Sequence, residues 1–115
     1  MSNYDVVFHI DKADSSLMVA FRNFLNYAAA LVTENYQAVL VVNSAAVTLL
    51  KADNVGIKEF VERAVAAGLS VRVCANALAD NEIRPEELYP QCDVVPAGIV
   101  EIVRLQGEGF AYIKP

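Results

Sequence analysis

Few side chains in this 115-residue chain are suited to chemistry, and two of them end predicted strands. His9 is the only histidine, and Cys74 is one of two cysteines. His9 follows an apolar segment that begins at Val6, and Cys74 follows an alternating segment that begins at Leu69. Imidazole exchanges protons near neutral pH and a thiolate is a nucleophile, so this pair would support thiol chemistry.

Three polar residues extend the candidate site. Asp11 follows His9 by two positions, and Asn76 follows Cys74 by two positions. Asn43 comes directly after a third apolar run. Ligands of open parallel sheets bind outside the carboxyl ends of the strands, so these side chains are expected to converge at one edge.

The surroundings of Cys74 favour its thiolate. Arg72 precedes it by two positions and shares its strand face, and its charge would stabilise the anion. Residues 75–78 are compatible with a loop-to-helix start, whose free N–H groups would act in the same way. The alternatives stay open here, since a buried cysteine is often inert and a lone histidine is often structural. Cys92 precedes a predicted strand at the opposite edge and is interpreted as incidental.

Short apolar segments predict the strands that would position these residues. The run 38–42 is continuously apolar, which is typical of a central strand covered on both faces. Segment 69–73 alternates apolar and polar residues. Strands are predicted at 6–8 (ending at 9–11), 38–42, 69–73, 93–95 and 110–113.

Segments with helical periodicity lie between these predicted strands. Asp14 or Ser15 would cap the first helix, whose wide apolar arc suggests burial against a second surface. Segment 98–106 contains good strand formers, but its apolar spacing and the following Gly107 favour a helix. Helices are predicted at 16–33 (inner face 17, 20, 21, 24, 28, 31 and 32), 57–67, 85–88 and 98–106. The alternation predicts one α/β domain over residues 1–115, with a mostly parallel sheet and helices on both faces.

Composition excludes several classes of function. The net charge is -5 and the nine basic residues are scattered singly, so electrostatic binding of nucleic acid is not expected. The apolar runs are too short for a membrane span, and the first residues lack an export signal, so a cytoplasmic protein with free thiols is expected. The chain has one histidine and no CxxC pair, and it lacks the GxGxxG, Walker and GxSxG motifs. No metal or organic cofactor is therefore expected.

Three segments together resemble the DsrE/DsrF-like family over nearly the whole chain. They are VFHID at 7–11, VRVCAN at 71–76 and, most specifically, the tail 95–115. The resemblance implies a three-layer α/β/α sandwich with a five-stranded parallel sheet, and homo-oligomers, commonly trimers or hexamers. Relatives act in sulfur oxidation and in the relay that thiolates transfer RNA, where a cysteine after the third strand carries a persulfide. Cys74 matches that cysteine. Two departures are Ala77, where the family often has Thr, and the 43–47 loop, which lacks the usual Gly.

The leading hypothesis is a sulfur carrier or sulfurtransferase that holds sulfane sulfur on Cys74 between a persulfide donor protein and an acceptor protein. His9 would assist proton transfer or stabilise the thiolate. The expected ligand-binding residues are Asn43, Asn76, Arg72 and Asp11.

Two other hypotheses remain. A non-catalytic small-ligand-binding or oligomeric scaffold subunit would bury Cys74, and the wide apolar face of the first helix favours it. A small-molecule enzyme that uses His9 and Asp11 is less favoured, because neither residue has a recognisable substrate-binding partner in the sequence.

Overall fold

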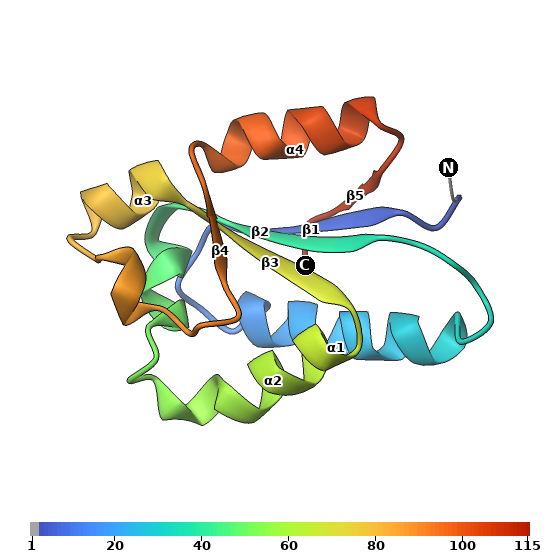
Figure 1. Ribbon diagram of the computed structural model, residues 1–115, viewed down its shortest axis with the longest axis horizontal. Coiled ribbons are helices and arrows are strands. Elements are labelled where there is room, and N and C mark those ends of the chain that lie inside the picture. The colour runs from blue at the N-terminus through green and yellow to red at the C-terminus, as the bar shows by residue number, and fades with distance from the viewer. Residues whose placement is uncertain (1–2) are drawn as a thin grey trace.

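A five-stranded parallel sheet lies at the centre of the computed structural model, which describes residues 3–115 (Figure 1). The strands are β1 (Val6–Ile10), β2 (Ala38–Val42), β3 (Leu69–Cys74), β4 (Asp93–Val95) and β5 (Ala111–Ile113). Their spatial order is β4-β3-β2-β1-β5, and every neighbouring pair is parallel. The five predicted strands are confirmed, two with the predicted bounds and three with one end that differs by one or two residues.

Helices cover both faces of this sheet. They are α1 (Ser16–Ala30), α2 (Lys58–Ala66), α3 (Ala75–Asp80) and α4 (Gly98–Gly107), with short 3₁₀ helices at Ser44–Leu50, Val55–Ile57 and Pro85–Glu87. Figure 1 shows α1 and α2 on one face, α4 alone on the other, and α3 beyond the end of β3. The three-layer α/β/α sandwich is therefore confirmed.

The segment with mixed strand and helix signals forms a helix, as predicted. In α4 the side chains of Ile102 and Leu105 are buried against β1 and β2, together with Phe110. The helix begins at Gly98 and ends at Gly107, so the two glycines mark its limits. Period-3.6 spacing therefore outweighs the strand propensity of the isoleucines and valines.

The first helix is shorter than predicted. The backbone N–H of Ser16 donates to Asp14 Oδ1 at 2.9 Å, which satisfies one of the free amides at the start. The helix ends at Ala30, not at residue 33. Val32 is 83% exposed, so its predicted place on the inner face is wrong. The β-branched residues that follow Leu31 favour helix less than the preceding alanines do, which is consistent with an early end.

The sheet separates two apolar cores of unequal size. The larger lies under α1 and α2 and contains Phe8, Phe21 and Phe24, each at most 1% exposed. The smaller lies under α4. Strands β1 and β2 are buried at every position, which confirms the prediction that segment 38–42 is covered on both faces. Within residues 3–115, no helix is long and apolar enough to cross a membrane.

Candidate functional site at the carboxyl edge of the sheet

The imidazole of His9 is held by hydrogen bonds on both sides. His9 is 6% exposed at the end of β1. Its Nδ1 lies 2.6 Å from the hydroxyl of Tyr112, and its Nε2 lies 2.9 Å from Asn43 Oδ1. A carbonyl oxygen only accepts, so Nε2–H donates to Asn43 and Nδ1 accepts from the tyrosine O–H in the neutral ring. The tautomer and the ring plane are thereby defined.

The backbone after β2 places Asn43 beside the end of β1. The Asn43 N–H donates to the Ile10 carbonyl at 3.0 Å, which continues the β1–β2 pairing by one step. Ser44 follows with a φ of 52°, in the left-handed region. Ser44 belongs to the 43–47 loop, which lacks a glycine, and it adopts there a conformation that glycine reaches most easily. The chain thus makes its sharp turn without the flexible residue.

Cys74 and Asn43 are neighbours under the start of α4. Val42 pairs with Val73 in the sheet, so the next residues on each strand lie side by side. A Cβ added to Gly98 would lie 3.2 Å from the Cβ atoms of both Asn43 and Cys74. Glycine lets the helix rest this closely on them, whereas a Cβ at this position would require its neighbours to shift. Cys74 itself is 6% exposed.

The charge of Arg72 is directed at α4. Arg72 Nη1 donates to Glu101 Oε2 at 2.6 Å, and its Nε donates to Ser70 Oγ at 3.1 Å. The hydrogen bond from Arg104, and then that from Arg72, lowers the pKa of the Glu101 carboxyl against the effect of burial. The expected free positive charge facing Cys74 is therefore replaced by an ion pair with Glu101.

The other two predicted ligand-binding residues lie at the rim. Lys114 Nζ donates to Asp11 Oδ1 at 2.7 Å, and this hydrogen bond is the main cause of the lowered pKa of Asp11. The pair joins the segment after β1 to the end of the chain. Asn76 is exposed in the first turn of α3. The structure therefore groups His9, Asn43 and Cys74, and places Asp11 and Asn76 around them.

Cys92 has the properties of a structural cysteine. It is partly buried and packs against the larger core. Burial, and to a lesser degree the charge of Asp93, raises the pKa of its thiol to about 12. A thiol with that pKa stays protonated at neutral pH and is a poor nucleophile.

Tyr112 also belongs to the site, but the sequence does not indicate its contact with His9. It lies on β5, which pairs with β1 at the far end of the strand order, so Tyr112 and His9 meet across 103 residues. No spacing rule connects positions that far apart. Among residues 3–115, no three His, Cys, Asp or Glu side chains form a group that would hold a metal ion.

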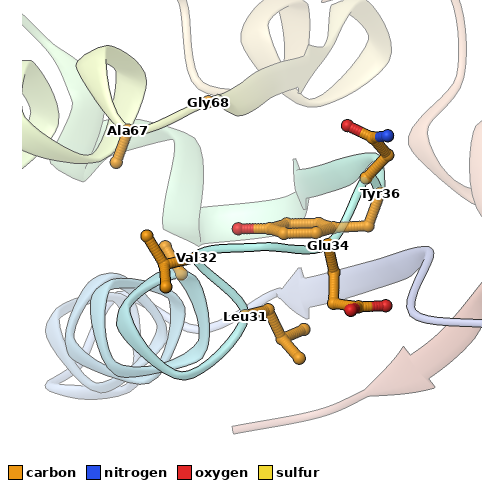
Figure 2. Close-up of a pocket in the computed structure, with 8 residues that line it drawn as sticks. Leu31, Val32, Glu34, Tyr36, Ala67 and Gly68 are labelled. Carbon is orange, nitrogen blue, oxygen red and sulfur yellow. The ribbon is translucent and has the colours of Figure 1, made fainter.

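A separate pocket of about 340 Å³ opens at the opposite, amino-terminal edge of the sheet (Figure 2). Figure 2 shows the ring of Tyr36 extending toward Val32, with Ala67 and Gly68 across from it. Glu34 is its only charged lining residue. None of its lining residues belongs to the predicted site.

Comparisons with known proteins place the chain in a family. The model of the DsrE/DsrF-like family matches residues 5–115. The solved structure of MTH1491 from Methanobacterium thermoautotrophicum, described as a protein of unknown function, is similar with a TM-score of 0.89 and 34% identity over 97% of this chain and 99% of that chain. The structure of BT1422 from Bacteroides thetaiotaomicron, a conserved protein of unknown function, has a TM-score of 0.73. Its identity is 11% over 96% of this chain and 95% of that chain, so this likeness concerns the fold alone. No curated protein matches the sequence. The match over residues 5–115 and the likeness to MTH1491 show that the chain belongs to the DsrE/DsrF-like family.

Proposed function

We propose that this protein carries sulfane sulfur as a persulfide on Cys74. One observation supports this most: Cys74 lies beneath the start of α4 and beside Asn43, whose amide oxygen is bound by His9. Family membership adds context, because the fold is related to that of sulfur-relay proteins.

The start of α4 would stabilise an anionic sulfur. The first N–H groups of a helix have no acceptor within the helix, and the helix dipole is positive there. No side chain caps this helix at Ala97. Gly98 brings the backbone close to Cys74 without an intervening side chain. Both the thiolate and the persulfide anion would gain from these amides.

His9 acts in this proposal as a positioning residue. Its Nε2–H holds the oxygen of the Asn43 amide, and Tyr112 holds the other side of the ring. With its oxygen held, Asn43 can direct its NH₂ group at the sulfur or the bound donor. Both ring nitrogens of His9 already have hydrogen-bond partners. We therefore assign His9 this positioning role in place of the expected proton transfer.

The transfer step balances without an external oxidant. The Cys74 thiolate attacks the outer sulfur of a donor R–S–SH, a new S–S bond forms at Sγ, and the donor S–S bond breaks. The donor leaves as a thiolate with the electron pair and takes up the proton that Cys74 released. An acceptor thiolate then attacks the outer sulfur of the Cys74 persulfide, which returns Cys74 to its thiolate. The 6% exposure of Cys74 requires a local opening, so loading should be slower than with a small free thiol.

The test is the intact mass after incubation with glutathione persulfide. Wild type and Cys92→Ser should each gain one sulfur, about 32 Da, that a reductant removes, since exchange occurs at the reactive thiol. Cys74→Ser should gain none. Loading of Cys74→Ser to the wild-type level would refute the assignment.

The outer surface of α4 favours a second function, that of an oligomeric scaffold subunit. Ile99, Val100 and Val103 are 59%, 62% and 66% exposed on this surface. The charges beside them are already paired within the chain, through Glu101 and Arg104. A contiguous apolar surface of this kind is typical of protein interfaces. A homotrimer or homohexamer is the assembly proposed.

Light scattering tests the scaffold function. Wild type should be an oligomer at micromolar concentration, and Val103→Glu should shift it to the monomer because a charge would be buried at the contact. Val32→Glu is the control, since Val32 is 83% exposed at the end of α1, away from α4. A monomeric wild type would contradict the assembly, whatever the outcome of sulfur loading.

A further inference from the structure

A second cavity, of about 400 Å³, lies between the start of α2 and the segment that leads into β4. Its lining includes Ala52, Val55, Lys58, Glu62, Tyr89 and Gln91. The volume lies at the lower end of the range of small-ligand sites, about 300–1,000 Å³. None of these residues belongs to the group around Cys74, so the cavity is independent of the proposed sulfur site.

The walls of this cavity are mostly apolar, and backbone hydrogen bonds hold them in place. The Tyr89 N–H donates to the Leu50 carbonyl at 3.1 Å, and the Ala52 N–H donates to the Glu87 carbonyl at 2.8 Å. The Tyr89 hydroxyl donates to the Asn54 carbonyl, which fixes the ring. Val55 is 75% exposed and supplies an apolar surface without a partner of its own. An apolar ligand group would pack here without rearrangement of the backbone.

Two opposite charges at the cavity lack partners. Among residues 3–115, neither Lys58 nor Glu62 takes part in an ion pair. Of the nine basic residues, five are in ion pairs and two lie over the ring of Phe60, which leaves Lys58 and Lys12. Lys58 and Glu62 are one helical turn apart, in the order that favours an i,i+4 pair less. Burial, and then the charge of Glu62, raises the pKa of Tyr89, which places that carboxylate near the cavity wall.

The side chain of Gln91 adds a hydrogen-bond acceptor to the cavity lining. Its side-chain oxygen Oε1 is buried and is the only buried side-chain N or O atom among residues 3–115 without a hydrogen bond. An unsatisfied buried polar atom costs about 1–3 kcal/mol, so a donor that reaches it is favoured. Gln91 lines the cavity, and the terminal torsion of glutamine is broad, so its amide can reorient toward a donor bound there.

We propose that this cavity binds a small zwitterion, a free α-amino acid with an apolar side chain. The carboxylate pairs with Lys58, the ammonium group donates to Glu62 and to Gln91 Oε1, and the side chain packs on Val55 and Tyr89. An α-amino acid fits because it carries both charges on one carbon, and one helical turn of α2 brings the complementary pair together. The volume suits one amino acid and excludes a long peptide segment.

The test is a titration of the ¹⁵N-labelled 115-residue chain with L-leucine, followed by amide chemical shifts. Saturable shifts confined to residues 52–62 and 89–91 are expected, with a Kd of about 1 mM, as for a weak small-molecule site. 4-Methylpentanoate lacks only the ammonium group of leucine and isoamylamine lacks only its carboxylate, and each should bind about tenfold more weakly.

Variants separate this site from adventitious binding. Lys58→Met and Glu62→Gln should each weaken leucine binding about tenfold. Lys12→Met is the control because Lys12 is the other basic residue that takes part in no ion pair or ring contact among residues 3–115, and the affinity of this variant should equal that of wild type. Either of two results overturns the proposal: shifts that do not saturate, or equal affinity for leucine and 4-methylpentanoate. The amide spectrum of each variant reports whether it is folded.

Discussion

Gly98 offers a sharp test of how α4 is seated on the candidate site. A Cβ at this position would lie 3.2 Å from the Cβ atoms of Asn43 and Cys74, and 3.3 Å from Val41 Cγ1. Carbon atoms in contact prefer separations of about 3.5–4.0 Å, so Gly98→Ala creates three short contacts at once. Two of the neighbouring atoms are attached directly to the backbone at strand ends, and Val41 is fully buried. None of them can move as the end of a long side chain would.

Two opposing effects set the magnitude. Overpacking a well-packed site costs about 1–3 kcal/mol. Replacing glycine by alanine returns about 0.4–1 kcal/mol, because the unfolded chain loses freedom. The free energy of unfolding should therefore fall by about 1–2 kcal/mol, and the Tm by about 4–8 °C for a domain of this size.

Gly107 is the matched control at the other end of α4. No atom lies within 4 Å of the Cβ that Gly107→Ala would add, so this variant should be as stable as wild type or more stable by up to about 1 kcal/mol. Thermal and urea unfolding followed by circular dichroism measures both variants. Equal stability of the two variants would refute the close seating of α4 on Asn43 and Cys74.

Two further predictions concern charge and thiol chemistry. Glu101→Gln should lower the free energy of unfolding by about 1–2 kcal/mol at pH 7, since it leaves the guanidinium of Arg72 partly buried without its carboxylate. Because the folded-state pKa of Glu101 is lowered, the stabilisation is present above the unfolded pKa and is lost as the pH falls through the folded value. Urea unfolding should thus show the deficit at pH 7 and a smaller one at pH 3, whereas Glu108→Gln, at the exposed partner of Arg104, should lose less at pH 7. A deficit independent of pH would contradict the ion-pair explanation. In Cys74→Ser, where Cys92 is the remaining thiol, Cys92 should react with iodoacetamide far more slowly than free cysteine at pH 8, because burial raises the pKa of Cys92 to about 12. Alkylation at the rate of free cysteine would show that Cys92 is not protected by burial.

Local patterns predicted the elements that carry the site. The β-branched run of β2 and the alternation of β3 indicate strands, so the positions of Asn43 and Cys74 at their carboxyl ends follow from the sequence. The apolar spacing of α4 outweighed its strand formers in the structure, as expected for a helix with one buried face. Periodicity suffices where an element packs one face on a sheet.

Features that depend on strand order could not be predicted. Tyr112 meets His9 because β5 pairs with β1, and nothing in the sequence of either strand states that pairing. Arg72 meets Glu101 because α4 crosses the face of β3. The ion pair turns the charge of Arg72 toward α4, whereas the spacing along β3 alone would place that charge beside Cys74. The cavity beside α2 likewise depends on the distant bridge between Lys51 and Leu88.

A sulfur carrier must both take up sulfur on Cys74 and release it. The most direct measurement uses Cys92→Ser, in which Cys74 is the only thiol. Its intact mass is recorded after glutathione persulfide, and again after a second thiol is added to the repurified protein. We expect a gain of about 32 Da on loading, followed by return to the starting mass with one sulfur found on the acceptor. A protein that stays at its starting mass throughout, while remaining folded, would contradict sulfur carriage by Cys74.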